Sequence, residues 1–429
     1  MRVTQTHCQA GPVRPAGTLP RMLPAGFAAS PASLADHVAR YGPVAFPGRD
    51  SRRREALIEE VERAGLTGRG GAAFPTARKL AATAAGRHPV VVANGTEAEP
   101  ASAKDQVLLA RSPHLVLDGA VVAAEIVGAR EAVVVAHRAV RDITEQAVSE
   151  RIRAGIDLVR IRVVTAADRF VGGEASAVVH WVGAGIPTPT VTPPRLSERG
   201  LGGAPTLVQN VETLAHLALI ARYGAAWFRM AGTPREPGSM LVTILGAVRE
   251  PGVREIALGT PTAEVLGLAG GPSAALQALL IGGYSGTWVD AAEATSRPFS
   301  SVGLADLSAG VGAGLIAALP EDACGLRETA RLVRYLAGES AGQCGPCLFG
   351  LDAVAGQVEG IAEGRTSDLR MLLRWLGQVD GRGACRHPDG TARLVRSALR
   401  VFAAELGLHA QGRCAGTASI LPLPPRARR

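Results

Sequence analysis

Glycine-rich turns followed by polar or charged side chains are the parts of this sequence best suited to chemistry. In residues 65–80, GLTGRGGAAFPTARKL, Gly68, Gly70 and Gly71 allow successive backbone N–H groups to converge, and the predicted helix that follows adds the positive end of its dipole. Lys79 can add a point charge. The segment matches neither a Walker A loop nor the Rossmann fingerprint. An anion-binding loop and an ordinary glycine-rich helix entry therefore carry equal weight at this point.

The segment from residue 90 to residue 109, VVVANGTEAEPASAKDQVLL, places amide and carboxylate groups directly after a predicted buried strand. Asn94, Glu97 and Glu99 would lie at the carboxyl edge of a parallel sheet, where ligands of doubly wound folds bind. The alternative is a solvated acidic loop. That alternative does not explain the lysine found here, because only Lys79 and Lys104 among 46 basic side chains are lysine rather than arginine.

Two more glycine turns each lead into a polar group at the start of a predicted helix. The turn in FVGGEASAVVHWV supplies Gly173 and Glu174, and the turn in GLGGAPTLVQNVETLA supplies Asn210 and Thr213. Taken singly, each is more often an ordinary helix cap than a binding site.

A CxxC pair, Cys344 and Cys347, lies in AGQCGPCLFG, and Cys385 follows in GACRH. Two thiolates on one turn can chelate a single ion or an iron–sulfur cluster. With His387 as a fourth ligand, the set would have the composition of a Cys₃His zinc site. A redox-active pair is a further alternative, although no predicted strand precedes it as in thioredoxin-like folds. The remaining cysteines are expected to take no part: Cys8, Cys324 and Cys414.

Composition excludes several classes of protein. The chain has 429 residues, of which 47% are apolar and 20% charged, so we expect a globular protein of two to four domains. Six cysteines are too few for a disulfide framework. No apolar run reaches the roughly 18 residues of a membrane helix, and the N-terminus lacks the apolar segment of a signal peptide. The sequence therefore predicts a cytoplasmic protein without a transmembrane segment.

The formal charge of +8 is dispersed among acidic residues, and only 4% of the residues are aromatic. A nucleic-acid-binding face combines clustered basic and aromatic side chains, so we expect no nucleic-acid partner. A dispersed positive field could attract an acidic redox protein, but an ordinary solvated surface is the simpler interpretation.

Three successive patterns would hold these residues. Residues 46–235 alternate predicted helices and buried strands, which indicates a parallel sheet flanked by helices. Residues 236–310 contain short strands around one helix, as in a small β-grasp module, and residues 311–410 suggest a helical bundle. We expect residues 1–45 to form a loosely ordered lead-in and residues 411–429 to form a fraying tail.

The individual elements follow from hydrophobic periodicity and from turn residues. Strands are predicted over 90–93, 131–136, 159–164, 241–244, 255–258 and 279–281. Helices are predicted over 52–63, 114–128, 142–154, 262–268, 326–337, 351–362, 367–377 and 392–405.

In this order, the four glycine motifs and the distal CxxC resemble the NADH-binding flavoprotein subunit of respiratory NADH:quinone oxidoreductase, the F chain of complex I. The resemblance extends from about residue 55 to about residue 405. It implies an α/β protein with a Rossmann-like FMN domain, a soluble-ligand-binding β-grasp domain and a helical domain that binds one [4Fe–4S] cluster. It also implies NADH as substrate and an iron–sulfur or ferredoxin-like subunit as redox partner.

The resemblance assigns residues as well. It places the cluster on Cys344, Cys347 and Cys385. In its terms Lys79 and Asn94 hydrogen-bond the FMN, whose reduced ring needs amide or cationic neighbours. The full set of implied flavin and dinucleotide contacts is Gly68, Arg69, Gly70, Gly71, Phe74, Lys79, Asn94, Glu97, Glu99, Gly173, Glu174, Asn210 and Thr213.

Several positions depart from the family pattern. Thr96 stands in place of an aspartate, Ala175 in place of a second glutamate, and Gln209 in place of an asparagine. Ala82 and Arg195 replace aromatic residues that stack on the adenine. Loss of both would weaken dinucleotide affinity about ten- to hundredfold unless the Arg195 guanidinium stacks instead.

The cluster motif departs as well, because Ala341 stands where the family has its first cysteine. A cubane could then be held by three thiolates, with one iron open or bound by another group such as His387. A three-iron cluster, zinc and the absence of any cluster are the alternatives. We expect a bound iron–sulfur cluster.

Three functions fit these observations. The first is an electron-transfer flavoprotein of NADH dehydrogenase type, which passes electrons from NADH through FMN to the cluster and on to a partner. The second is a docking or scaffold subunit that kept the fold and lost its cofactors, which the substitutions favour. The third is a ferredoxin-linked oxidoreductase of the Rnf type that does not use NADH, although this chain lacks the ferredoxin-type cysteine repeats of that family. We expect the first.

Overall fold

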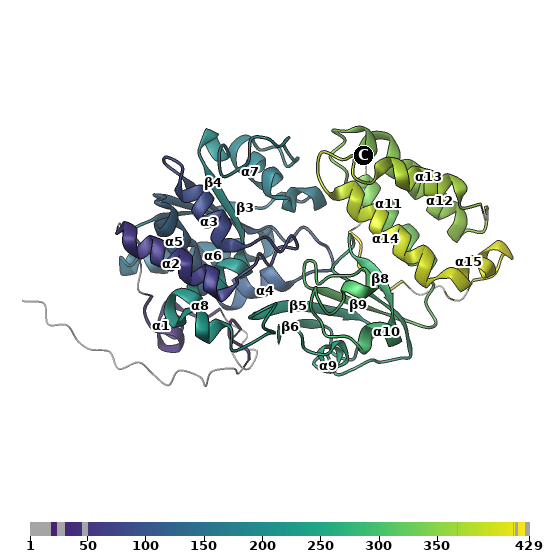
Figure 1. The fold of residues 1–429 in the computed structure, drawn as a ribbon, viewed down its shortest axis with the longest axis horizontal. Helices are drawn as coiled ribbons and strands as arrows, with labels where there is room; N and C mark the ends of the chain where they lie inside the picture. The colour runs from purple at the N-terminus through teal and green to yellow at the C-terminus, as the bar shows by residue number, and fades with distance from the viewer. Residues whose placement is uncertain are drawn as a thin grey trace, which may run out of the picture.

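The structure is a computed structural model that describes residues 19–23, 31–44, 50–366, 368–414, 416 and 419–424. Figure 1 shows a helix-flanked sheet formed by the earlier part of the chain, a second sheet beside it, and a group of helices formed by the later part. The α/β class expected from the sequence is confirmed.

Within the described residues, the first sheet has four parallel strands in the order β3-β2-β1-β4. The chain builds outward from β1 through β2 to β3 and then returns to place β4 on the other side of β1. In doubly wound folds, ligands bind at the carboxyl ends of the strands where the order reverses, which here lies between β1 and β4. The strands are β1 (Val90–Gly95), β2 (Glu131–Ala136), β3 (Arg160–Thr165) and β4 (Thr206–Asn210), which confirms the three strands predicted in this region.

Helices cover both faces of this sheet because alternate residues of β1 and β2 are apolar on each side. Val91 and Val134 face α5 and α8, whereas Val92 and Val133 face α7. Near-continuous apolar strands of this kind are typical of a parallel sheet that is buried on both faces. The helices of this region are α2 (Ser51–Ala64), α3 (Thr76–Ala84), α4 (Lys104–Arg111), α5 (Pro113–Val127), α6 (Arg141–Ala154), α7 (Ala175–Ala184) and α8 (Val211–Phe228), with 3₁₀ turns η1 (Arg138–Val140), η2 (Phe170–Gly173) and η3 (Leu201–Gly203).

The second sheet has five strands in the described chain, in the order β6-β5-β9-β7-β8. Two antiparallel hairpins lie on either side of β9, which is parallel to β5, and α9 packs on one face of the sheet. This is the β-grasp arrangement expected from the sequence. Its elements are β5 (Ser239–Gly246), β6 (Gly252–Ala257), α9 (Thr262–Gly267), β7 (Leu276–Ile281), β8 (Thr287–Asp290), α10 (Ala291–Thr295), η4 (Ala305–Leu307) and β9 (Leu315–Pro320).

The central strand β9 lies beyond the boundary expected at residue 310. Its six residues are all buried, so the sequence shows a continuous apolar run rather than the alternation of a half-exposed strand. Periodicity cannot distinguish such a run from a buried helix segment. The other expected boundaries between regions stay predictions.

The C-terminal helices pack on the face of the second sheet opposite α9. Leu280 and Ala317 of the sheet share one core with Leu332, Val354 and Leu394 of the helices. The helices predicted over 326–337 and 351–362 are confirmed, and the one predicted from residue 367 begins at Arg370. The single helix predicted over 392–405 is wrong, because α14 begins at His387 and ends at Val401, and α15 begins at Ala403. These elements are α11 (Gly325–Gly338), the π-helical turn η5 (Pro346–Gly350), α12 (Leu351–Ala362), α13 (Arg370–Val379), α14 (His387–Val401) and α15 (Ala403–Ala410).

Both ends of the described chain are packed, so the expectation of loose order is wrong where residues are described. Helix α1 (Leu34–Tyr41) is closed by a capping box at Ser33, and the Met22 N–H donates to the Glu255 carboxylate of β6 at 2.8 Å. Near the other end, Leu421 is 2% exposed among the C-terminal helices. Local composition did not reveal these partners because they are distant in sequence. The rest of both expected segments lies outside the described residues.

Across the described chain, no single helix is both long and apolar enough to cross a bilayer. Helices α4 and α5 meet the length and composition requirements only as a pair, and that pair is bent by 97°. All of α5 is buried in the protein. The cellular location expected from the sequence stays a prediction.

The contact between α5 and α8 generates a test of the fold. A Cβ on Gly119 of α5 would lie 1.9 Å from the carbonyl oxygen of Leu214, so Gly119→Ala should force two buried helices apart and lower stability by about 1–3 kcal/mol. Thermal unfolding measures the change. The control is Gly267→Ala at the end of α9, where no heavy atom lies within 4 Å of the added methyl and stability should be unchanged or slightly higher. Equal melting temperatures for Gly119→Ala and the unaltered protein would contradict this close packing.

Candidate functional site

Two asparagines lie side by side at the point in the first sheet where the strand order reverses. Asn94 ends the regular part of β1, Asn210 ends β4, and the two residues are paired in register. The Asn210 Nδ2 donates to the Asn94 carbonyl oxygen at 3.3 Å, and its Oδ1 accepts from the Glu212 N–H at 3.0 Å as the cap of α8. The fold therefore brings together two residues that the sequence separates by more than a hundred positions.

The glycine loop between α2 and α3 lies against this strand edge. The Gly68 N–H donates to the Phe74 carbonyl oxygen at 3.0 Å, which closes the loop on itself. A Cβ on Gly70 would lie 3.3 Å from the Asn210 Cβ, and Gly71 adopts a φ of 104°, which a side chain would strain. Helix α3 begins directly after the loop without a side-chain cap, so its first N–H groups face the loop.

Arg69 and Thr213 hold this loop in place. The Arg69 N–H donates to the Thr213 Oγ1 at 2.9 Å, which attaches the loop to the first turn of α8. The Arg69 guanidinium donates to Thr67 and to the Pro237 carbonyl oxygen. These two predicted site residues thus have positioning contacts within the protein, and a direct contact with the cofactor stays a prediction.

Lys79 and Phe74 lie on the ligand side of the loop. The Lys79 Nζ donates to the Val208 carbonyl oxygen of β4 at 3.3 Å and lies 6.0 Å from the centroid of the Phe74 ring. Burial lowers the pKa of Lys79, and the nearby Glu174 carboxylate acts against that shift. Phe74 is 44% exposed, so its ring is available to an aromatic ligand.

Gly173 and Glu174 connect η2 and α7 to the same edge. The Asn94 Nδ2 donates to the Gly173 carbonyl oxygen at 3.0 Å, and a Cβ on Gly173 would lie 2.9 Å from the Ala98 Cβ. The Glu174 carboxylate caps α7 by accepting from the Ser176 N–H at 2.8 Å. The close approach of Ala98 explains why residue 173 is a glycine, and the capping of α7 explains why residue 174 is a glutamate.

Glu97 and Glu99 are half-buried, and each accepts a hydrogen bond from a backbone N–H of the protein. Glu97 accepts from the Gln106 N–H at 2.7 Å, and Glu99 accepts from the Tyr284 N–H of the second sheet region at 2.9 Å. Burial raises the pKa of Glu97 to about 7 and that of Glu99 to about 8. Their roles as cofactor contacts stay predictions, and Glu99 joins the two sheet regions.

A buried charge network beneath the asparagines was not part of the predicted site. The Lys104 Nζ lies 2.7 Å from Asp105 Oδ1 and 2.8 Å from Glu212 Oε2, and Asp105 Oδ2 accepts from Asn210 at 2.6 Å. Burial acts to lower the pKa of Lys104, but the two carboxylates outweigh it and hold the pKa above its usual range. The rarity of lysine in the sequence singled out Lys104, but it could not show which carboxylates pair with it.

The residues around the strand edge fit a flavin nucleotide. Several buried polar atoms there have no hydrogen-bond partner in the protein, among them three that lie outside the predicted site residues: Thr76 Oγ1 at the start of α3, Thr96 Oγ1 and Gln209 Nε2. Unsatisfied buried groups are costly, so a polar ligand at this edge would stabilise them. Two of the three are positions where the sequence departs from the family pattern. A phosphate would meet the N–H groups of the loop and of α3.

The substituted aromatic positions, Ala82 and Arg195, are both exposed. Arg195 is exposed, and its N–H donates to the Glu198 carboxylate at 3.1 Å. Its guanidinium is thus in a position to meet solvent or a ligand, as the stacking alternative requires.

The three predicted cluster ligands form one group in the helical region. Burial raises the pKa of Cys347 to about 12, with the thiols of Cys344 and Cys385 as further causes, so the three side chains interact. The Ala341 backbone is a further cause that acts to lower the pKa of the Cys347 thiol, so the substituted position lies near the group. In the described chain, their ligand atoms are not among those that converge closely enough for one ion. A cluster fits better than zinc, because each thiolate of a cluster binds a different iron.

His387, the suggested fourth ligand, is buried and lies near Cys385, and its role as a ligand stays a prediction. Its Nε2 lies 2.8 Å from the Leu336 carbonyl oxygen, and its Nδ1 has no partner in the protein. The free Nδ1 is the atom that could act as a further ligand.

One short segment joins the strand edge to the cysteines. In η2, the Phe170 N–H donates to the Glu339 carboxylate at 2.8 Å, and the Phe170 ring centroid lies 5.6 Å from that of His387. The Glu174 carboxylate is a cause of pKa shifts at both Lys79 and Cys385. The two halves of the predicted site therefore lie on either side of η2.

Comparison with known families gives one match for the region of the strand edge and another for the region of the cysteines. A family model described as the Nuo51 FMN-binding domain matches residues 61–219, and one described as the NADH-ubiquinone oxidoreductase-F iron-sulfur binding region matches residues 327–409. The second of two F chains of NADH-quinone oxidoreductase in Rhizobium meliloti is 32% identical over 84% of this chain and 90% of its own. The F chain of the Streptomyces coelicolor enzyme is 31% identical over 83% of each chain.

Hydrogenase subunits are similar as well. The NAD-reducing hydrogenase HoxS subunit alpha of Cupriavidus necator is 32% identical over 86% of this chain and 65% of its own. A crystal structure of an NAD+-reducing [NiFe]-hydrogenase has a TM-score of 0.78 and 31% identity over 84% of this chain and 63% of that chain. The present chain thus spans less than two thirds of the hydrogenase chains. All these relatives are subunits of larger assemblies.

The raised pKa of Glu99 predicts a pH dependence of stability. Between its pKa of about 4.5 when unfolded and about 8 when folded, the folded protein binds a proton that the unfolded chain lacks, so the free energy of unfolding falls as pH rises. Glu99→Gln removes this titration and keeps an oxygen that can accept from the Tyr284 N–H. Its melting temperature should therefore fall less than that of the unaltered protein between about pH 5 and pH 8. Glu264→Gln removes an exposed carboxylate and should reproduce the original slope; an unchanged slope in Glu99→Gln would contradict the assignment.

Proposed function

Because the chain belongs to the F-chain family of NADH-quinone oxidoreductases, we propose that it is an electron-transfer subunit that exchanges electrons between NADH and an iron–sulfur cluster by way of FMN. The observation that carries the proposal is the position of η2. Its Gly173 carbonyl oxygen accepts from Asn94 on the flavin side, and its Phe170 contacts Glu339 and His387 on the cluster side. One short turn thus sets the relation between the two redox sites.

The residues at the strand edge bind and orient the flavin. The N–H groups of Gly68 and Arg69 are used to hold the loop, so the phosphate would meet the N–H groups of Gly70, Gly71 and the first turn of α3, and Lys79 would supply a cation beside the flavin ring. Asn94 and Gln209 offer amides at the ends of β1 and β4. When bound, FMN accepts a hydride from NADH and releases electrons singly. No nucleophile or acid–base pair is required of the protein.

The exposed Phe74 ring supports a dinucleotide site beside the loop. An aromatic face can stack on a base or nicotinamide, and the ring lies near the cationic groups of Arg78 and Lys79. Since Ala82 and Arg195 replace two aromatic residues, Phe74 would carry much of the remaining stacking. The hydrogenase relatives are named for NAD reduction, so this exchange can operate in either direction.

A redox partner would dock near the cysteines. Leu348 and Phe349 follow Cys347 directly on η5 and are 54% and 71% exposed. Exposed apolar side chains beside a redox centre are suited to contact with another protein. We assign this surface to an iron–sulfur or ferredoxin-like subunit.

Loss of the Lys79 cation tests the flavin site. A charge-assisted hydrogen bond contributes about 1.5–3 kcal/mol, so Lys79→Ala should weaken FMN affinity about 10- to 100-fold. Flavin fluorescence titration of the flavin-depleted protein measures the dissociation constant. Arg78→Ala removes an exposed charge from the same helix and should change that constant less than about threefold. Equal FMN affinity in Lys79→Ala and the unaltered protein would reject this site and favour a subunit that has lost its cofactor.

Restoration of the missing cysteine tests the cluster site. The Ala341 backbone acts on the pKa of the Cys347 thiol, so position 341 lies near the group and a thiol there would be expected to join it. Ala341→Cys should raise iron and acid-labile sulfide toward the four of each in a complete cluster and alter the EPR spectrum after reduction. Ala292→Cys adds a thiol at an exposed position of α10 and should change neither. If Ala341→Cys holds no more iron and its spectrum is unchanged, the three-thiolate cluster is wrong.

A further inference from the structure

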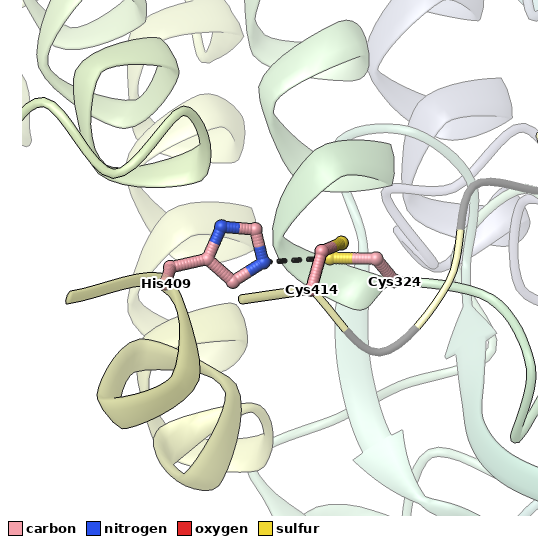
Figure 2. A group of neighbouring side chains, drawn as sticks. All are labelled: Cys324, His409 and Cys414. Atoms are coloured by element: carbon pink, nitrogen blue, oxygen red, sulfur yellow. Dashed lines mark hydrogen bonds between the residues drawn. The ribbon is translucent and has the colours of Figure 1, made fainter. Parts of the chain in front are cut away.

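A second group of metal-ligand side chains lies in the helical region, apart from the predicted cluster cysteines. Cys324, His409 and Cys414 each offer one ligand atom, and these atoms all lie within 4.8 Å of one another. Figure 2 shows the Cys324 and Cys414 thiols next to each other, with the His409 Nε2 directed at the Cys324 Sγ at a distance of 3.2 Å. The sequence analysis expected no role for these cysteines, because local spacing does not reveal a group assembled from opposite ends of the region.

These side chains come from three different parts of the fold. Cys324 caps the start of α11 directly after β9, and its Sγ accepts from the Arg327 N–H at 3.4 Å. His409 lies in the last turn of α15, and Cys414 follows that helix. Cys324 and His409 are 1% and 3% exposed, whereas Cys414 is half-buried. The group therefore lies at the edge of the core, where an ion could enter from one side.

We propose that Cys324, His409 and Cys414 bind a structural zinc ion. Zinc takes thiolate and imidazole ligands tetrahedrally, and at its usual bond lengths two such ligand atoms lie about 3.5–3.8 Å apart. The present separations of at most 4.8 Å require shifts of about 1 Å or less. Two thiolates with one imidazole favour zinc over oxygen-preferring cations. Binding releases the two thiol protons to solvent, and water fills the fourth position.

Hydrogen bonds on two sides hold the Cys324 sulfur in place: it accepts from the Arg327 N–H and donates to the Glu405 carboxylate. The start of α11 directs N–H groups and the positive end of the helix dipole at its sulfur. The Glu405 carboxylate lies 3.1 Å from the same sulfur and accepts from the Leu326 N–H and from Gln277 of β7. Metal binding would displace the proton that the Cys324 thiol donates to this carboxylate, and the positive charge of the ion would then lie beside Glu405.

The ion would bind the segment after α15 to the junction between the second sheet and the C-terminal helices. A Cβ on Gly416 would lie 1.6 Å from the Asp322 carbonyl oxygen, so the segment after Cys414 already presses on the loop before Cys324. Beyond it, the Leu421 N–H approaches the Glu328 carboxylate of α11 at 3.4 Å. A zinc ion at this point would link α11, α15 and the C-terminal segment.

Metal analysis of the full-length protein with its cofactors tests the proposal. Mass spectrometry for metals should find about one zinc per chain, and Cys414→Ser should lower zinc affinity about 100-fold or more while flavin and iron contents remain unchanged. Cys347→Ser should show the opposite pattern, with iron lost and zinc retained. Cys8→Ser is the matched control for loss of a thiol and should retain both metals.

Cobalt provides a measurement that does not depend on any variant. Zinc-depleted protein titrated with Co²⁺ should develop the visible bands of tetrahedral thiolate coordination, and zinc should abolish them. Absence of these bands in the unaltered protein, equal zinc content in Cys414→Ser, or loss of zinc in Cys347→Ser would each overturn the proposal. So would a Cys324–Cys414 disulfide found by mass spectrometry in protein kept under reducing conditions.

Discussion

The buried Lys104 ammonium is the interaction on which the arrangement of the flavin-binding edge depends. It pairs with Asp105 on α4 and with Glu212 on α8, and these carboxylates in turn hold Asn210 and the Leu241 N–H of β5. A buried charge of this kind is tolerated only where its partners are fixed in place. One lysine thus links the end of β4, two helices and the second sheet, so the strand edge cannot move independently of the rest of the protein.

The regions of the protein are joined by polar contacts at the places where redox chemistry requires fixed geometry. Glu99 connects the segment after β1 to Tyr284, and η2 connects the strand edge to Glu339 and His387. These contacts are buried or half-buried, and apolar packing surrounds them. Electron transfer between two sites depends on their separation, so a rigid junction serves this function better than a flexible linker would.

Cysteines divide into two groups by their position in the fold. Cys344, Cys347 and Cys385 lie near η2 and the flavin-binding edge, whereas Cys324 and Cys414 lie at the far end of the bundle beside His409. The first group lacks one family ligand at Ala341 but keeps an unpartnered His387 Nδ1 nearby. The second group has no counterpart among the motifs that identified the family. Redox and structural roles for thiols can therefore coexist in one small helical region.

The order of residues was sufficient to predict the class of fold, most of the helices and strands, and the motifs that place the chain in its family. Those features are local, because apolar periodicity, glycine turns and the CxxC spacing are properties of neighbouring residues. The folded arrangement was needed to show that Arg69 and Thr213 position the loop, that Glu99 joins two regions, and that β9 completes the second sheet. It was also needed to show that Cys324, His409 and Cys414 meet. Each of these depends on a contact between segments far apart in the chain, and no local pattern encodes such a contact.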